Sequence, residues 1–117
     1  AGAVRAAAHE DINMLTLLPA ATQSGLQVKD LEGNWHDVPC DYGTIAVNCG
    51  DMLQMASDHY FPSTTHRVIN PEDSNSNVSR LSLPLFLHAL PDAMLSENYS
   101  ADAYLNERLR ELGHLTS

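Results

Sequence analysis

Basic residues are scarce in this sequence. Its 117 residues include 6 Lys and Arg against 15 Asp and Glu, which gives a formal net charge of −9. Binding to nucleic acid or to an anionic membrane requires clustered basic side chains, and the sequence has no such cluster. It also lacks an apolar run near the roughly 18 residues of a membrane span, and a basic-then-apolar secretion signal. We therefore expect neither nucleic acid nor a membrane as a partner.

Cysteine is scarcer still, with only Cys40 and Cys49. Two cysteines beside six histidines, with no secretion signal, are typical of reduced, buried thiols. This composition predicts a reducing, cytoplasmic setting. The first residue is Ala rather than Met, so we expect a piece of a longer chain, with a cloning remnant at Ala1 and Gly2.

The chain is long enough for one domain with one core. Short apolar runs separated by turn residues predict a mainly β fold rather than a helical bundle. The runs at 26–28 and 35–38 should pair as an antiparallel hairpin, because both alternate apolar with polar residues around a glycine-containing turn. The β-branched run 44–49 suits a central strand. Further strands are expected from Val4, at 14–18, at 65–69 and at 78–88.

Two helices are expected. Asp51 could cap a single turn over 52–55, which is too short to be stable without packing. Ser100 can be the N-cap of an amphipathic helix of about 12 residues that ends at Gly113. Between strands, Asn70 to Asn77 is the most polar segment and is expected to be an exposed, mobile loop.

His9, Glu10 and Asp11 form the first candidate site. In an extended segment, side chains two residues apart point to the same side, so His9 and Asp11 can converge on one metal ion while Glu10 points away. Such a pair alone more often marks a solvated turn. His66 lies in a β-branched strand, where a histidine bonded to the backbone would be equally ordinary.

The segment 78–88 alternates regularly. Leucines at 81, 83, 85 and 87 share one face, and the other face carries Arg80, Ser82, Phe86 and His88. A face with an arginine and a serine opposite a leucine face suggests that Arg80 and Ser82 point into a barrel. The alternative is that Arg80 pairs with one of the many acidic side chains.

Together these residues resemble a known family. His9-x-Asp11 is followed after 54 residues by His66, and after 13 more by Arg80-x-Ser82. This series resembles the iron(II)- and 2-oxoglutarate-dependent oxygenases, in the branch that contains isopenicillin N synthase. Five further blocks resemble family blocks in the same order, and they are 15–18, 25–28, 33–39, 47–54 and 63–68. The resemblance runs from about residue 5 to residue 92.

The resemblance implies a fold and a site. The fold is a double-stranded β-helix, or jelly roll, of roughly eight strands, with residues 1–95 as its core and 96–117 as a C-terminal helical extension. His9, Asp11 and His66 would be the ligands of Fe(II), which leaves three adjacent positions open. In the family, 2-oxoglutarate takes two of these and O2 the third. Arg80 and Ser82 would bind the distal carboxylate of 2-oxoglutarate, since a guanidinium is its natural partner.

The implied function is oxidation of a small organic substrate, hydroxylation or a related reaction, coupled to oxidative decarboxylation of 2-oxoglutarate. Two alternatives stay open. Some relatives of isopenicillin N synthase use the Arg-x-Ser pair for the substrate's own carboxylate and need no 2-oxoglutarate. The chain could also be a catalytically silent metal-binding fragment, because the long N-terminal half of family members is missing. The leucine face would then be uncovered, which predicts self-association or docking of the C-terminal helix onto it.

The remaining polar and aromatic residues are given lesser roles. Glu10 is expected to be solvated or to lie beside the metal ligands. Tyr60 and Phe61 precede His66 in a loop that lines the pocket mouth in family members, and the resemblance leaves open whether they face substrate. Trp35 and Phe86 are expected in the core. Structural or surface positions are expected for His36, His59, His88 and His114.

Overall fold

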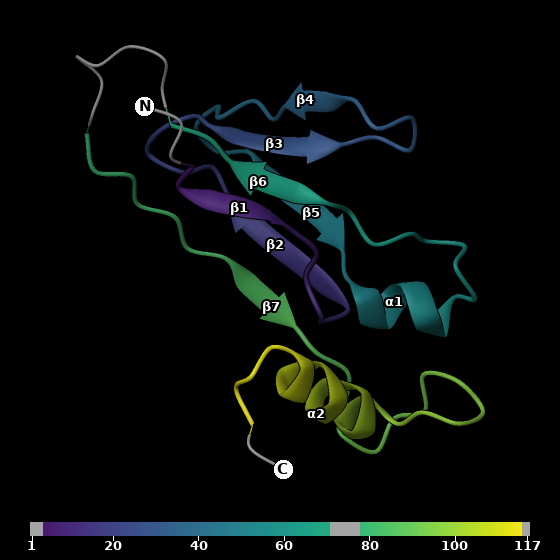
Figure 1. The fold of residues 1–117 in the computed structure, drawn as a ribbon. Coiled ribbons are helices and arrows are strands. Elements are labelled where there is room, and N and C mark those ends of the chain that lie inside the picture. The colour runs from purple at the N-terminus through teal and green to yellow at the C-terminus, as the bar shows by residue number, and fades with distance from the viewer. Residues whose placement is uncertain (1–3, 71–77, 116–117) are drawn as a thin grey trace.

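The computed structural model describes residues 4–70 and 78–115, which form two antiparallel sheets and two helices (Figure 1). In chain order the elements are β1 (Ala6–His9), β2 (Leu15–Pro19), β3 (Leu26–Lys29), β4 (Trp35–Asp37), β5 (Ile45–Cys49), α1 (Asp51–Ala56), β6 (His66–Val68), β7 (Leu85–Leu87) and α2 (Ala101–Glu111). The predicted mainly β, jelly-roll class is confirmed. The predicted loop at 70–77 lies outside the described residues except for Asn70, as does the suggested remnant at Ala1 and Gly2.

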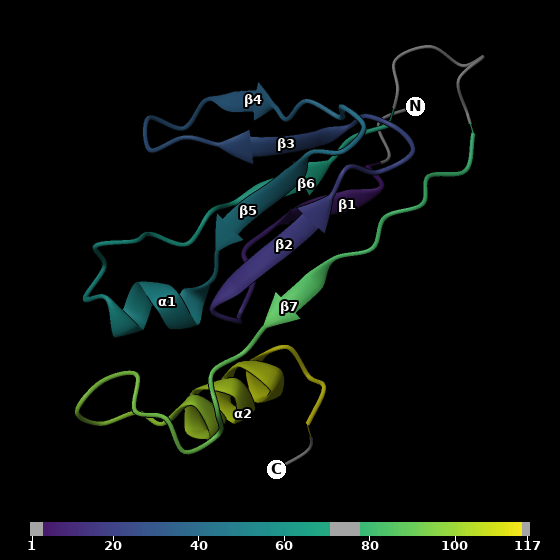
Figure 2. The same cartoon turned by 180° about the vertical axis from the view of Figure 1, so that it is seen from behind.

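The strands form two sheets that face each other (Figures 1 and 2). One has the order β1-β6-β3-β4, and the other has the order β5-β2-β7. Strands far apart in sequence are therefore neighbours, because β6 inserts between β1 and β3 and β7 pairs with β2. The predicted hairpin is confirmed, with Val28 opposite His36 in β3 and β4.

Three expectations about the strands and helices are wrong. The 44–49 run is not central: β5 lies at the edge of its sheet, and β2 occupies the middle. Only Leu85–Leu87 of the 78–88 run forms a strand, because only this part reaches β2 for pairing. Asp51 does not cap α1. Gly50 is the N-cap, with no side-chain cap hydrogen bond, and Asp51 is the first helical residue.

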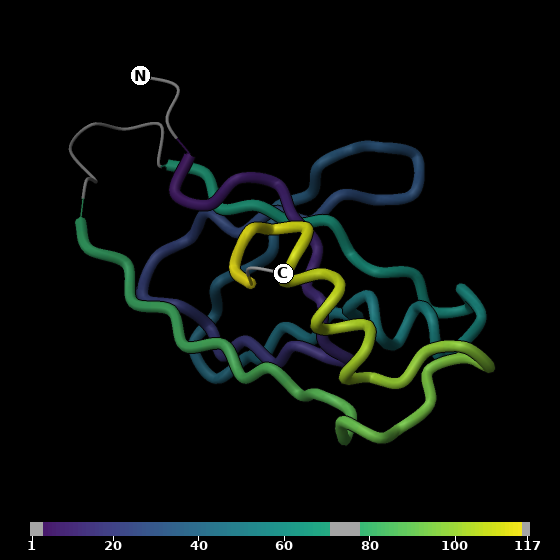
Figure 3. Tube along the Cα trace, turned by 60° about the horizontal axis from the view of Figure 1, so that its bottom comes forward, coloured from purple at the N-terminus to yellow at the C-terminus, as the bar shows by residue number. Residues whose placement is uncertain are grey.

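The C-terminal helix forms as predicted. The Ser100 hydroxyl accepts a hydrogen bond from the Ala103 amide, and Gly113 follows the helix with φ +76°. Its position was not predicted. Tyr104 and Ala101 pack against Met52 of α1 and Leu95, so α2 lies beside α1 at one end of the sheets (Figures 1 and 3).

The leucine face stays exposed, so the prediction that α2 docks onto it is wrong. Leu81, Leu83, Leu85 and Leu87 are 51–68% exposed. The strand register adds two residues of β5 to this surface, since Val47 and Leu85 both lie opposite Leu17, and Ile45 lies opposite Pro19. Ile45 and Val47 are also more than half exposed. We refer to these six residues as the apolar sheet face. The division into 1–95 and 96–117 stays a prediction.

The amino-terminal end of α1 holds the segment after β1. The amides of Asp51 and Met52 donate to the carbonyl oxygens of Asp11 and Ile12, at 2.8 and 3.1 Å. This approach requires glycine at position 50, since a Cβ there would overlap the Asn13 carbonyl oxygen. The helix end therefore fixes the backbone that carries Asp11.

Neither helix of the described chain is long and apolar enough to cross a membrane. Cys40 and Cys49 are both free and half-buried. The Cys40 thiol donates to the Ala21 carbonyl oxygen at 2.8 Å. A cytoplasmic location stays a prediction.

Replacing Gly50 by Ala tests the contact between α1 and the Asp11 segment. Gly50 has φ −106°, which Ala adopts freely, so the added methyl group acts only through its overlap with Asn13. We expect Gly50→Ala to lower the free energy of unfolding by about 3 kcal/mol in urea titrations. Gly43→Ala is the control: φ is +82° and no atom lies within 4 Å, so only backbone strain of about 1 kcal/mol is expected. Equal losses in the two variants would contradict the contact.

Candidate metal centre

The antiparallel pairing of β1 and β6 places two imidazoles side by side. His9 lies opposite His66 in the register, and their ring centroids are 4.3 Å apart. Asp11 follows β1 and turns its carboxylate toward both rings. Its Oδ1 lies 3.8 Å from His9 Nε2 and 3.5 Å from His66 Nε2. The structure thus brings together the three residues that the sequence singled out as ligands.

Burial differs among the three side chains. Those of Asp11 and His66 are 7% and 14% exposed, whereas that of His9 is 49% exposed. The cluster therefore sits at the rim of the fold, with Asp11 on its buried side and His9 toward solvent. This arrangement gives an ion or a small molecule access from outside.

Each imidazole is oriented by a backbone carbonyl oxygen. His9 Nδ1 lies 2.8 Å from the Ala7 oxygen, and His66 Nδ1 lies 2.9 Å from the Thr64 oxygen. A carbonyl oxygen can only accept, so each Nδ1 carries the proton and donates it. In a neutral ring Nε2 then presents a lone pair. Both lone pairs face Asp11 Oδ1.

Three electron-pair donors converge here, and their ligand atoms all lie within 4.8 Å of one another. With neutral rings no proton stands between them, so they repel one another unless a cation binds. Two imidazole nitrogens and one carboxylate oxygen are the facial ligand set of non-haem Fe(II) oxygenases. The residues present fit an Fe(II) ion.

A cavity of about 430 Å³ opens between the two sheets beside this cluster. Its walls are mostly apolar and come from both sheets, with Leu18 and Ala46 on one side and Leu26, Val28 and Val68 on the other. His9, Asp11 and His66 line it at one place, and Arg80 and Ser82 line it as well. The cavity therefore connects the predicted ligands with the predicted carboxylate-binding pair.

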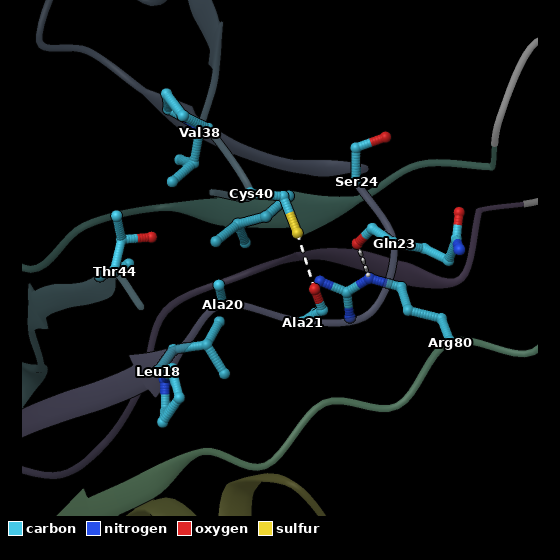
Figure 4. A pocket seen from close by; sticks show the side chains of 13 residues that line it. Leu18, Ala20, Ala21, Gln23, Ser24, Val38, Cys40, Thr44 and Arg80 are labelled. Atoms are coloured by element: carbon cyan, nitrogen blue, oxygen red, sulfur yellow. Dashed lines mark hydrogen bonds between the residues drawn. The ribbon is translucent and has the colours of Figure 1, made fainter. Parts of the chain in front are cut away.

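Arg80 is held in place by the chain after β2. Its Nε donates to the Gln23 carbonyl oxygen at 3.0 Å, as Figure 4 shows. Arg80 also borders a second cavity of about 20 Å³, where Cys40 lies, so this residue lines both spaces. Within the described residues, no carboxylate pairs with Arg80, which removes the alternative of a bridge to an acidic side chain there.

The aromatic residues singled out in the sequence lie mostly away from the core. Phe86 is not in the core: it is 49% exposed and lines the cavity, opposite Thr16. Trp35 is half-buried on the edge strand β4, with the Arg67 guanidinium 4.0 Å from its ring centroid. Tyr60 and Phe61 are 78% and 48% exposed, and neither lines the cavity in the described chain.

The other histidines lie outside the cluster. All four are exposed, as expected: His36, His59, His88 and His114. His36 bonds to Asp30 at 2.6 Å, and this hydrogen bond lowers the pKa of the Asp30 carboxyl to about 2.

Two other carboxylates, those of Glu10 and Asp51, belong to residues that adjoin Asp11, in sequence or through a backbone hydrogen bond. Glu10 accepts a hydrogen bond from the Thr65 hydroxyl at 2.8 Å. Burial raises the pKa of Asp51, and the negative charge of Glu10 adds to this effect while Ser63 opposes it. Glu10 therefore lies next to the predicted ligands but points away from their meeting point, as the strand alternation predicted.

Sequence reasoning missed two residues of the site. Thr16 and Asn48 both donate to Asp11 Oδ2, at 2.6 and 3.0 Å. The signal for Thr16 was present, because it is the polar residue inside the apolar run 14–18 and is 4% exposed. Asn48 could not be found in this way, since its contact spans 37 residues.

Comparison with known proteins identifies the family. Residues 2–89 match the sequence model of the 2OG-Fe(II) oxygenase superfamily. The chain belongs to this superfamily. It is 38% identical over 81 residues to isopenicillin N synthase of Streptantibioticus cattleyicolor, a match that covers 69% of this chain and 23% of the synthase.

Solved structures of the superfamily share the fold. A proposed oxygenase of Shewanella oneidensis is 63% identical, with a TM-score of 0.87 over 98% of this chain and 42% of that one. A full-length Neurospora crassa protein, solved in complex with alpha-KG, is 31% identical, with a TM-score of 0.79 over 94% of this chain and 38% of that one. The chain thus spans less than half the length of these relatives.

The tautomers of the two imidazoles can be tested directly. We expect ¹⁵N-detected NMR of the metal-free protein at neutral pH to show the proton of His9 and His66 on Nδ1, because Ala7 and Thr64 accept it. The exposed His114 serves as the internal control. A neutral ring that carries its only proton on Nε2, in either histidine, would contradict the convergence of lone pairs on Asp11.

Proposed function

We propose that the chain carries the catalytic centre of an Fe(II)-dependent oxygenase that uses 2-oxoglutarate and O2 to oxidise a small organic substrate. The observation that carries the proposal is the convergence of His9 Nε2, His66 Nε2 and Asp11 Oδ1 at the edge of a cavity that Arg80 and Ser82 also line. Family membership and the alpha-KG complex of the Neurospora crassa protein support this choice of metal and cosubstrate.

His9, Asp11 and His66 would hold the iron. Bound iron, with 2-oxoglutarate and O2, supplies the oxidative step: one oxygen atom enters the substrate, the other enters succinate, and CO2 is released. The chain's own groups orient the reactants. The carbonyl oxygens of Ala7 and Thr64 accept the Nδ1 proton, which fixes the tautomer and the ring orientation, so each neutral ring presents the lone pair of Nε2 to the metal.

Arg80 and Ser82 would bind the distal carboxylate of 2-oxoglutarate. Gln23 fixes the Nε end of the Arg80 guanidinium, which leaves its two NH2 groups for an anion. The apolar walls of the cavity suit the methylene groups between the two carboxylates and exclude water. Phe86 lines the same space and is a candidate contact for substrate.

A binding experiment tests Arg80. We expect 2-oxoglutarate to bind the anaerobic, Fe(II)-loaded protein and Arg80→Ala to weaken this binding about 10- to 100-fold, as expected for loss of a charge-assisted pair. Calorimetry gives both affinities. The matched control is 2-oxobutanoate, which keeps the keto acid but lacks the distal carboxylate, so its affinity should not change. Equal losses for both ligands would contradict the assigned role of Arg80.

The second candidate function is an oxidase that needs no 2-oxoglutarate, which the likeness to isopenicillin N synthase favours. The two functions differ in their products. Succinate formed from 2-oxoglutarate in proportion to O2 consumed supports the oxygenase. Consumption of O2 that needs a substrate carboxylate but not 2-oxoglutarate supports the oxidase. Iron binding without O2 consumption over a broad substrate panel would favour a silent metal-binding chain.

We also propose that this chain associates with a second copy through the apolar sheet face. Six large apolar side chains are each 51–68% exposed, and the strand register places four of them, Ile45, Val47, Leu85 and Leu87, on one face of the β5-β2-β7 sheet. This exceeds the scattered apolar residues of ordinary monomer surfaces. Sheet faces of this kind can pack on each other with the strands aligned within about 30°. The six residues of the apolar sheet face are uncharged. Although each chain has a net charge of −9, no like charges of these residues would meet at the contact between two copies.

Substitution of Leu85 tests the association. Sedimentation velocity should show concentration-dependent dimers for the parent chain. Leu85→Lys should shift the population to monomers, because a dimer would bury an unpaired charge. Leu31→Lys is the matched control, since Leu31 is 87% exposed in the β3–β4 turn, away from this face. A strictly monomeric parent at all concentrations would refute the proposal.

A further inference from the structure

The two oxygens of the Asp11 carboxylate have different surroundings. Oδ1 faces the Nε2 atoms of His9 and His66 and accepts no hydrogen bond from a described residue. Oδ2 accepts two, from the Thr16 hydroxyl at 2.6 Å and from the Asn48 amide at 3.0 Å. A carboxylate with both oxygens free could bind a cation through either oxygen or through both. In Asp11 only Oδ1 is free of hydrogen-bond donors from the described residues, so Oδ1 is the oxygen available to a cation.

The two donors come from one row of the β5-β2-β7 sheet. Thr16 lies directly opposite Asn48 in the pairing of β2 with β5. Both side chains also line the cavity, and they therefore rise from the same face toward Asp11. The donors are fixed by sheet register rather than by a loop, which gives them a defined position relative to the carboxylate.

The proton of the Thr16 hydroxyl is committed to Asp11. The side-chain amide of Asn13 donates to Thr16 Oγ1 at 3.2 Å and to the Leu15 carbonyl oxygen at 2.6 Å. An amide NH2 can only donate, so Thr16 accepts from Asn13 and its single proton points to Oδ2. The longer contact from Thr16 to Asn13 Oδ1, at 3.5 Å, is the weaker alternative. The chain of donors runs from Asn13 through Thr16 to Asp11.

These groups are almost completely removed from water. Asn13, Thr16 and Asp11 are 2%, 4% and 8% exposed. A buried carboxylate that loses a donor retains the cost of desolvation, because water cannot replace the lost hydrogen bond. The arrangement around Oδ2 should therefore be rigid, and the free position of the carboxylate is at Oδ1.

We propose that Thr16 and Asn48 are positioning residues that make Asp11 a ligand through Oδ1 alone. This inference rests on the proposed function of the site. Six positions around Fe(II) are shared among three protein ligands and three open places. If both oxygens of Asp11 bound the metal, only two places would remain, too few for a two-point cosubstrate together with O2. The two donors keep the third place open.

The variant Thr16→Val tests the inference, because valine keeps the shape of threonine and removes the hydroxyl. The probe is Co(II) alone, titrated anaerobically, with affinity from calorimetry and coordination from the visible absorption spectrum. We expect affinity to fall about 10- to 100-fold, as is usual when a hydrogen-bond partner of a metal ligand is lost. The spectrum should change as well, since Oδ2 then keeps only the Asn48 amide as a donor and is held less firmly away from the ion.

Further variants separate this role from a structural one. Thr16→Ser keeps the hydroxyl and should restore the parental spectrum and most of the affinity. Asn48→Ala removes the other donor from a half-buried position and should change affinity and spectrum in the same direction. It carries the test if Thr16→Val does not fold. Thr44→Val is the matched control, because the Thr44 hydroxyl bonds only to the Asp41 carbonyl oxygen, in an exposed turn.

The outcomes distinguish this inference from the proposed function. Loss of Co(II) binding in His66→Ala, together with parental affinity and spectrum in both Thr16→Val and Asn48→Ala, would overturn the positioning role and leave the metal site intact. Parental Co(II) binding in His66→Ala would refute the metal site itself. A spectral change in Thr16→Val that Thr16→Ser reverses and Thr44→Val lacks supports the inference.

Discussion

The pairing of His9 with His66 across β1 and β6 is the constraint on which the rest of the site depends. These two residues are 57 positions apart in the sequence, yet the strand register brings their ring centroids to 4.3 Å. A shift of one residue in either strand would turn one imidazole to the opposite face of the sheet. The register is held from the other side by β3, where Val28 lies opposite His66.

The two sheets contribute different parts of the centre. The β1-β6-β3-β4 sheet supplies the imidazoles, each with Nδ1 bonded to a carbonyl oxygen of its own chain segment. The β5-β2-β7 sheet supplies the donors that hold Asp11. The start of α1 fixes the backbone of Asp11, and this requires glycine at position 50. The candidate metal centre therefore depends on how the two sheets meet, and neither sheet could form it alone.

Local sequence patterns predicted the parts of the fold that depend on local physics. Alternation and turn residues predicted the β3–β4 hairpin, and the Ser100 cap with Gly113 predicted α2. Patterns failed where distant contacts decide. The regular alternation of 78–88 suggested one long strand, but β2 has partners for only Leu85–Leu87. The position of α2 against Met52, and the contact of Asn48 with Asp11, likewise depend on tertiary packing. The three predicted ligands could be singled out because their chemistry and their order resemble a family, since spacing alone left His66 an ordinary strand histidine.

A metal ion is expected to bind where the side chains of His9, His66 and Asp11 meet. The most direct measurement is an anomalous difference map, at the iron absorption edge, from crystals of the chain grown anaerobically with Fe(II). We expect one strong peak at bonding distance, about 2 Å, from His9 Nε2, His66 Nε2 and Asp11 Oδ1. A map with no peak there at full iron loading, or with its peak at other residues, would contradict this expectation.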